Sequence, residues 1–264
     1  MAIHPPASRH SNTYAMITGG GQGLGLAIAR QLVDEGCRNL ALVGRDSRKL
    51  DGAAAELRVK GAKVVTISAD ISKADACARA VSEAIAGLGT VNVLVNAAAS
   101  TARGSVTDAS EADFDAMFNT NVKGVFFLMQ GVVRHALEKK TPASILNILS
   151  MSAHTGQSNL TIYSASKGAV ATLTKNTAIA HRNDRIRCNA LLPGWMDTPG
   201  EDAVQRKFEG ATDGWLERAE ATQPFGQLIK TDQLALLASY VLSPDAGVMT
   251  GSLIDYDQTV QTNA

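Results

Sequence analysis

Tyr163 and Lys167, in the run IYSASKGAV, are the residues whose types and spacing point most directly to chemistry. Residues four apart on a helix lie on one face, so we expect the lysine ammonium beside the phenol. A tyrosine with its ordinary pKa of about 10 is a poor base at neutral pH, and a neighbouring cation stabilises its phenolate. Lowering that pKa to near 7 needs about 4 kcal/mol. Because such pairs also occur by chance on surface helices, the rest of the chain must support this interpretation.

The run YAMITGGGQGLGLAIARQLVDEG predicts a short strand, a glycine turn and an amphipathic helix. Thr18, Gly19, Gly23 and Gly25 form the pattern TGxxxGxG. Gly19 permits a tight turn, Gly23 lets the backbone approach a pyrophosphate, and Gly25 lets the helix pack closely on the strand. Free amides and the positive end of the helix dipole favour phosphate there. The segment therefore predicts a dinucleotide-binding loop.

The next predicted strand, in NLALVGRDSRKL, bears on the type of dinucleotide. A unit that binds NAD usually has Asp or Glu at this strand end, where it accepts from the ribose 2′-hydroxyl. This chain has Arg45 instead, with Arg48 and Lys49 close behind. A guanidinium suits a 2′-phosphate, which favours NADP(H). NAD(H) stays open, because a shift of one residue would put the Asp46 carboxylate on the ribose.

With these residues assembled, the sequence resembles the short-chain dehydrogenase/reductase family over nearly its whole length. The ordered motifs are TGGGQGLG, Asp70, Asn96, Asn121, Ser150 at the end of the strand-like ASILNILS, Tyr163 with Lys167, and the run PGWMDT. The resemblance implies that Tyr163 is the acid/base and that Ser150 orients the substrate oxygen. It also implies that Lys167 binds the nicotinamide ribose and lowers the tyrosine pKa, and that Asn121 holds a water linking Lys167 to solvent.

Further cofactor contacts follow from the same resemblance. Asp70 would contact the adenine with Ile71 beside it, and Asn96 would stabilise the central strand near the adenosine ribose. Thr198 would hold the nicotinamide carboxamide. The complete implied set is Thr18, Gly19, Gln22, Gly23, Leu24, Gly25, Arg45, Asp70, Ile71, Asn96, Tyr163, Lys167, Pro193, Gly194, Met196 and Thr198.

Three departures from the family pattern stand out. The usual NNAG reads Asn96-Ala97-Ala98-Ala99, which puts a local contact with the adenosine in doubt. Gln22 stands where many NADP-dependent relatives carry a basic residue, and this weakens the preference for NADP(H). Asp257 and Gln258 replace glycines near the carboxyl end and could change a subunit contact or reach the active site.

Length and periodicity predict one α/β domain over residues 13–264 after a flexible arm at 1–12. Strand-like runs around 14–18, 39–44, 63–69, 91–97, 143–149, 185–192 and 252–255 alternate with helical stretches. This alternation predicts a doubly wound, Rossmann-like parallel sheet with helices on both faces and ligands at the carboxyl ends of the strands. The long segment at about 199–223 interrupts the pattern and is expected to be a substrate lid.

Composition narrows the class of protein. The formal net charge is zero, which favours neither a nucleic-acid nor an anionic membrane partner. The three cysteines lack metal-ligand spacing, so no metal is expected, and their small odd number suits a reducing cytoplasm and structural burial. The amino-terminal run has no signal-peptide core, and no apolar stretch approaches 18 residues.

We expect reversible hydride transfer between a nicotinamide and a secondary alcohol or ketone, or a lactol and lactone. The candidate pocket residues are polar with two aromatics, namely Ser150, His154, Gln157, Asn159, Trp195, Glu201, Asp202 and Trp215. Such a lining suits a sugar or polyol, because each buried polar group needs a partner. The runs PGWMDTPGED and PFGQL are also similar to those of sugar- and polyol-directed relatives.

Two other functions stay open at this point. A reductase of carrier-linked 3-ketoacyl groups would need a basic patch near the pocket, and the predicted lid mixes charges of both signs. A non-catalytic dinucleotide sensor is the second alternative, although Ser150, Tyr163 and Lys167 are all present. By resemblance, the long helices at about 111–137 and 161–181 would pair in a homodimer or homotetramer.

Overall fold

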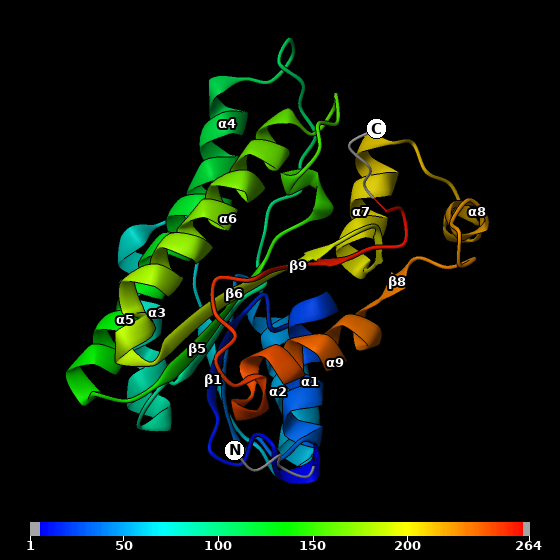
Figure 1. Ribbon diagram of the computed structural model, residues 1–264. Coiled ribbons are helices and arrows are strands. Elements are labelled where there is room, and N and C mark those ends of the chain that lie inside the picture. The colour runs from blue at the N-terminus through cyan, green and yellow to red at the C-terminus, as the bar shows by residue number, and fades with distance from the viewer. Residues whose placement is uncertain (1–5, 261–264) are drawn as a thin grey trace.

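The computed structural model describes residues 6–260 and is built around a parallel seven-stranded sheet (Figure 1). The strand order is β3-β2-β1-β4-β5-β6-β9. The strands are β1 (Tyr14–Thr18), β2 (Asn39–Gly44), β3 (Lys63–Ser68), β4 (Val93–Asn96), β5 (Ala143–Ile148), β6 (Ile186–Pro193) and β9 (Leu253–Tyr256). All seven predicted strands are confirmed to within two residues at each end.

Helices cover both faces of this sheet, which is why its strands are almost continuously apolar. One face carries α1 (Gly23–Asp34), α2 (Ser47–Val59) and α9 (Thr231–Leu242), and their buried side chains form one apolar core with the sheet. The other face carries α3 (Ala74–Leu88), α5 (Val125–Lys139) and α6 (Thr161–His181), packed on a second core. Figure 1 shows the two helical layers on opposite sides of the strands. The predicted doubly wound fold is therefore confirmed.

The predicted helix at 111–137 consists of three parts. Residues of α4 (Glu111–Phe118) pass through a π-helical stretch, Asn119–Gly124, directly into α5. A Cβ at Gly124 would overlap the carbonyl oxygen of Ile71, so the backbones approach closely at this widened stretch. This close packing fixes Asn121 at the edge of the region where the strands end.

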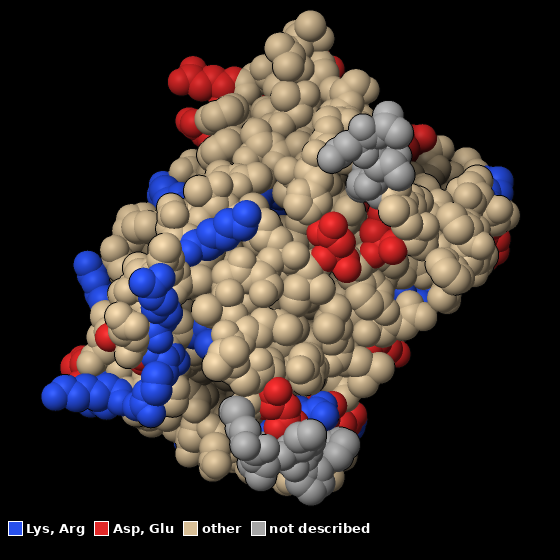
Figure 2. Space-filling view, in the orientation of Figure 1, with Lys and Arg blue, Asp and Glu red and all other residues tan. Residues whose placement is uncertain are grey.

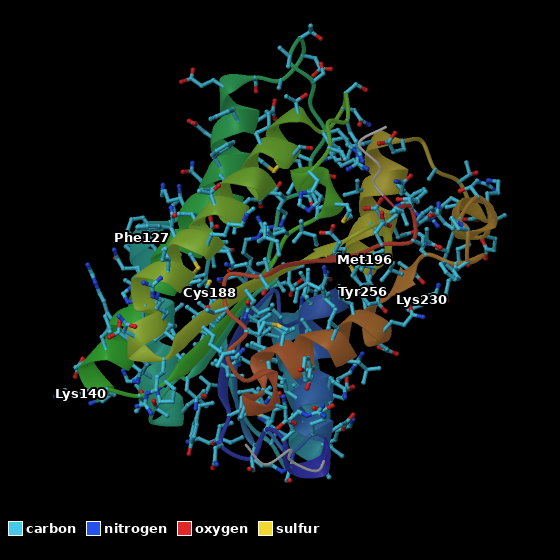
Figure 3. The ribbon with its side chains drawn as sticks, in the orientation of Figure 1. Phe127, Lys140, Cys188, Met196, Lys230 and Tyr256 are labelled. Atoms are coloured by element: carbon cyan, nitrogen blue, oxygen red, sulfur yellow. The ribbon has the colours of Figure 1, made fainter. Side chains whose placement is uncertain are left out.

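The expected lid segment folds as two short helices beyond the carboxyl ends of the strands. These are α7 (Pro199–Phe208) and α8 (Trp215–Ala221), between β7 (Met196–Asp197) and β8 (Ile229–Lys230), which pair in a separate two-stranded sheet. Figure 3 places Met196 and Tyr256 near each other on this side of the molecule, close to where β6 continues into β7. This small sheet thus attaches α7 and α8 to the main domain.

The amino-terminal segment differs from the flexible arm that the sequence predicted. Residues 1–5 lie outside the described residues, but Arg9 forms ion pairs with Glu35 and Asp245, each at 3.0 Å. His10 is fully buried and contacts Ser239 through its Nε2 atom at 2.9 Å. This part of the segment is therefore docked on α1 and α9.

Other expectations from composition can be compared with the fold. Cys37, Cys77 and Cys188 are free and buried, as the sequence predicted. Within residues 6–260, no helix is long and apolar enough to cross a membrane. Figure 2 shows Lys and Arg side chains gathered over the ends of α5 and α6, far from the carboxyl ends of the strands.

Candidate active site

A cavity of about 1300 Å³ opens at the carboxyl ends of the strands. It begins beside β1, which pairs with β2 on one side and with β4 on the other, so that the strand order reverses there. Ligands of open α/β sheets bind at such a reversal. From there the cavity continues past the ends of β5 and β6 to α7. Its length and position suit a dinucleotide with a substrate at its far end.

The glycine loop between β1 and α1 lines the first part of the cavity. Gly19 has φ of +68°, in the left-handed region that favours glycine. A Cβ at Gly25 would overlap the Gly19 carbonyl oxygen, so helix and loop approach as the sequence predicted. The predicted Gly19, Gln22, Gly23, Leu24 and Gly25 all line the cavity. Backbone amides at the start of α1 can therefore face a pyrophosphate.

Thr18 lies outside the cavity lining and has a structural role instead. Its hydroxyl donates to the Val95 carbonyl at 3.4 Å and accepts from the amides of Ala97 and Ala98 at 3.1 and 3.2 Å. The side chain therefore joins the ends of β1 and β4. Its predicted contact with the cofactor stays a prediction.

The end of β2 brings two cations to the adenosine part of the cavity. Arg45 and Lys49 both line it, and Lys49 Nζ donates to Gln22 Oε1 at 2.6 Å. The uncharged Gln22 therefore has a lysine beside it. Asp46 caps α2 by accepting from the Lys49 amide at 3.2 Å, which directs its carboxylate to the helix. Asp46 lines the cavity as well as Arg45, so the residues at this strand end can serve either form of the dinucleotide.

Asp70 and Ile71 line the next stretch of the cavity, as the resemblance implied. The Asp70 carboxylate accepts from the Ser72 amide at 3.0 Å, and this hydrogen bond lowers its pKa. An ionised carboxylate is therefore held at the end of β3. It is placed to accept from an amino group of a bound base.

Asn96 is buried behind the cavity and does not line it. Its Nδ2 donates to Asn147 Oδ1 at 2.9 Å, and Asn147 Nδ2 donates to Thr174 at 3.0 Å. The predicted support of the central strand is confirmed by this chain of amides from β4 through β5 to α6. The predicted proximity to the adenosine ribose is not seen.

Ser150, Tyr163 and Lys167 meet at the wall of the cavity. Tyr163 and Lys167 lie on successive turns of α6, and Lys167 Nζ is 5.5 Å from the phenol ring centre. The Lys167 ammonium donates to the Ile148 carbonyl at the end of β5, at 2.8 Å. Ser150 follows that strand, and its hydroxyl accepts from the Ser152 amide at 3.1 Å. One strand end and one helix therefore position all three groups.

The acidity of these groups corrects one expectation. Loss of surrounding water raises the pKa of Tyr163 to about 12, although a hydrogen bond with Ser150 acts to lower it. Burial lowers the pKa of Lys167 to about 8. The predicted lowering of the tyrosine pKa is therefore wrong for the protein alone, because desolvation outweighs the hydrogen bond with Ser150 and the positive charge of Arg103. A phenolate needs additional positive charge at this point.

Asn121 is buried in the π-helical stretch and is tied to the loop after β4. Its Oδ1 accepts from the Ser100 amide at 2.8 Å, and its Nδ2 donates to the Ser100 carbonyl at 2.9 Å and to Ser166 at 3.1 Å. It therefore holds that loop against α6. Its role in a water chain to Lys167 stays a prediction.

The segment after β6 forms the wall opposite the glycine loop. Pro193, Gly194, Met196 and Thr198 all line the cavity, as predicted. The Thr198 hydroxyl caps α7 by accepting from the Glu201 amide at 3.0 Å. Its proton is still available, so it can donate to a carbonyl in the cavity while capping the helix.

The predicted substrate residues divide into two groups. Those that line the cavity are Ser150, Gln157, Asn159, Trp195 and Glu201. The other three lie outside the lining and correct the prediction. His154 pairs with Asp255 at 2.9 Å. Trp215 is buried in a small apolar cluster with Ala219 and Leu228, and its indole donates to Asp202 at 2.7 Å. Trp215 and Asp202 therefore stabilise the junction of α7 and α8.

Arg103 was missed by the sequence analysis, because nothing in the run STARGS distinguishes it. It lines the cavity from the loop after β4, and its Nε donates to Glu209 at 2.8 Å. Glu209 directly follows α7, and Asp257 and Thr259 also add polar groups to the cavity lining. The suggestion that Asp257 reaches the active-site region is supported by this placement.

Comparison with known proteins agrees with this geometry. The model of the short chain dehydrogenase family matches residues 13–208. A gluconate 5-dehydrogenase of Gluconobacter oxydans is 29% identical over 254 residues, which cover 96% of each chain. A sorbitol dehydrogenase of Cereibacter sphaeroides is 29% identical over 247 residues, which cover 92% of this chain and 95% of the relative.

Solved structures with the same fold contain either form of the nicotinamide dinucleotide. The actinorhodin polyketide ketoreductase with NADPH has a TM-score of 0.87 and 27% identity, over 94% of this chain and 97% of the other. The 3-ketoacyl-(acyl-carrier-protein) reductase of Brucella melitensis with NADH has a TM-score of 0.83 and 30% identity, over 95% and 98%. A nicotinamide dinucleotide thus fits this architecture.

Proposed function

Since the chain belongs to the short chain dehydrogenase family, we propose that it interconverts a secondary alcohol and a ketone on a sugar or polyol. The observation that carries this proposal is the meeting of Ser150, Tyr163 and Lys167 at the far end of the dinucleotide-sized cavity. The bound nicotinamide dinucleotide supplies the hydride acceptor or donor. The protein supplies orientation and proton transfer.

Tyr163 moves the proton at the substrate oxygen. In oxidation its phenolate accepts the hydroxyl proton, and in reduction its hydroxyl returns that proton to the forming alcohol. Ser150 donates a hydrogen bond to the same oxygen, and this bond strengthens as negative charge develops. Because burial raises the pKa of Tyr163 to about 12, the phenolate must be stabilised by positive charge in the complete site.

Lys167 has two uses in this arrangement. Its ammonium already donates to the Ile148 carbonyl, which holds it below the phenol. Its remaining protons can bond the ribose hydroxyls of the cofactor. Its pKa of about 8 means that it carries charge at neutral pH and can release a proton in mildly alkaline solution. It therefore supports the tyrosine mainly by position and charge.

A polyhydroxylated substrate is supported by the polar lining beyond Tyr163. Gln157, Asn159, Gln205 and Gln223 present amide groups that both donate and accept hydrogen bonds. A long acyl chain or a sterol that covered these side chains would leave their remaining amide atoms without partners, at a cost of about 1–3 kcal/mol for each atom that it buries. A sugar or polyol can pair with several of them at once.

Tyr163→Phe tests the proposal directly. The variant should lose about a hundredfold or more in kcat with alditols, because the proton has no acceptor. Its affinity for the dinucleotide, followed by quenching of tryptophan fluorescence, should change little. Turnover close to that of the unmodified enzyme would remove Tyr163 from the mechanism.

For the cofactor we propose a preference for NADP(H). Arg45, Asp46 and Lys49 all line the adenosine part of the cavity, but the Asp46 carboxylate also accepts from the Lys49 amide at the start of α2. Arg45→Ala should raise the KM for NADP by about tenfold or more while changing that for NAD little, because only the 2′-phosphate requires the guanidinium. Equal effects on the two cofactors would contradict this preference.

A reductase of carrier-linked ketoacyl groups is the second candidate, favoured by the ketoreductases among the structural relatives. Arg103 near the cavity and Arg206 on α7 both pair with carboxylates, so they offer little free positive charge to an acidic carrier. A 3-ketoacyl thioester belongs in the substrate panel as the test. Faster reduction of that thioester than of any ketose would favour this candidate.

We propose further that the protein assembles as a homodimer or homotetramer through α4, α5 and α6. Phe114 on α4 and Phe126 on α5 are 47% and 42% exposed, and Ile179 on α6 is 62% exposed. Large apolar side chains at this exposure are typical of surfaces that contact another subunit. Light scattering after size-exclusion chromatography measures the assembled mass directly, and a monomer would contradict the proposal.

A further inference from the structure

The charges around the substrate end of the cavity are unbalanced. Three carboxylates line it, from Glu201, Glu209 and Asp257, and Arg103 is the guanidinium among them. Lys167 also lines the cavity, but it lies below Tyr163 and bonds the Ile148 carbonyl. Figure 2 shows acidic side chains gathered on the surface near the end of β9. The substrate end therefore carries a negative excess.

Arg103 is already engaged by the chain itself. Its Nε donates to Glu209 at 2.8 Å, its NH1 donates to the Thr101 carbonyl at 3.1 Å, and its NH2 lies 3.9 Å from Glu201. The Arg103 side chain is 17% exposed. Glu209 and Glu201 therefore already offset the charge of this guanidinium, so a carboxylate on the substrate would gain little net attraction from it.

The carboxylates are held in place on the other sides. Glu201 accepts from the Trp195 indole at 2.9 Å and from Gln205 at 2.8 Å. The Asp257 carboxylate packs so closely on Gly194 that a Cβ there would overlap it. Both negative charges therefore stay in the wall of the cavity and can accept hydrogen bonds from hydroxyl groups.

The names of the relatives do not indicate whether the substrate is neutral or acidic. One is named for gluconate, a sugar acid, and another for sorbitol, the uncharged polyol of the same chain length. The carboxylates in the cavity wall favour the neutral substrate. A hydroxyl donates to a carboxylate, whereas a second carboxylate is repelled by it and loses its own water.

Resting on the proposed function, we propose that the substrate end selects an uncharged polyhydroxylated substrate and rejects the same carbon skeleton when it carries a carboxylate. Glu201, Glu209 and Asp257 act as the selecting groups. Arg103 positions Glu209, and its own positive charge is offset by Glu209 and Glu201.

The test compares matched pairs, sorbitol with gluconate and galactitol with galactonate, using one enzyme preparation and saturating cofactor. The kcat/KM for the alditol should exceed that for the aldonate by at least about tenfold, mainly through a higher KM for the aldonate. The excess should shrink at high salt, because part of the repulsion is screened.

Two variants identify the source of the selection. Glu209→Gln keeps the shape and an acceptor for Arg103 but removes one charge, so the ratio should fall about fivefold, the effect of one partly exposed charge. Glu217→Gln removes an exposed carboxylate of α8 that does not line the cavity, and it should leave the ratio unchanged. Tryptophan fluorescence titration with the dinucleotide shows whether each variant is folded.

The outcomes separate the two proposals. An enzyme that oxidises the aldonate as well as the alditol, or a ratio that Glu209→Gln and Glu217→Gln change equally, would overturn the charge selection and leave the proposed function standing. An enzyme that binds the dinucleotide but oxidises neither member of any pair would refute the proposed function, and the charge selection with it.

Discussion

Replacing Lys167 by methionine should make the protein more stable at neutral pH while removing its activity. Lys167 is 4% exposed, and burial lowers its pKa from an ordinary 10.5 to about 8. At about 1.4 kcal/mol per pKa unit, keeping this side chain charged in the folded protein costs about 3 kcal/mol at pH 7. Methionine fills nearly the same volume without a charge.

The hydrogen bond to the Ile148 carbonyl is lost in the variant, which costs about 1 kcal/mol. The expected net gain at pH 7 is therefore about 2 kcal/mol. The folded pKa lies below the unfolded one, so the folded protein binds fewer protons and its stability rises with pH between about 8 and 10.5. The advantage of the variant should shrink by about 1.4 kcal/mol between pH 6 and pH 9.

Urea unfolding of both proteins at pH 6, 7 and 9, followed by far-ultraviolet circular dichroism, measures this difference. Comparing the two proteins at each pH cancels the other titrating groups. A variant that is less stable than the unmodified protein at every pH, by a constant amount, would refute the reasoning. It would mean that the site compensates the lysine charge in the folded protein.

Three further predictions concern the framework. Gly25→Ala should weaken dinucleotide binding by about tenfold or more, because the new Cβ would overlap the Gly19 carbonyl. Fluorescence titration measures this affinity, and an unchanged affinity would contradict the role of the close contact. Arg187 on β6 donates to five acceptors on β5, the end of α9 and the loop after it, and one ammonium cannot satisfy them all. Arg187→Lys should therefore lower the free energy of unfolding in urea by about 3 kcal/mol, and a loss below about 0.5 kcal/mol would show that water replaces the guanidinium. Burial lowers the pKa of His10, so the folded protein should lose stability as the pH falls through 6.5. His10→Gln should reduce this dependence of the thermal stability on pH. If the dependence is the same in the variant, His10 is not its source.

The parts of the site that could be predicted from the sequence are those set by local spacing. Tyr163 and Lys167 share one helix, and Ser150 follows a strand that the apolar run already defined. The glycine loop likewise lies within a single strand–turn–helix unit. Such groups are placed by the geometry of one or two elements, so the sequence determines their neighbours.

The parts that could not be predicted depend on contacts between distant segments. Arg103 and Glu209 are 106 residues apart, and His154 meets Asp255 across 101 residues. Trp195 and Trp215 look alike in the sequence, but only the orientation of α8 decides that Trp215 is buried outside the cavity. The pKa of Tyr163 was misjudged for a related reason, because desolvation arises from all the segments that enclose the phenol.

The contribution of β9 and the residues after it to the cavity has a consequence for biosynthesis. The adenosine part of the cavity is built mainly by segments before residue 100, whereas Asp257 and Thr259 are among the last described residues to leave the ribosome. A single domain of this kind generally folds as one unit once its segments are available. The residues around the adenosine are therefore made well before the wall around the substrate can form, because that wall needs the segment that follows β9.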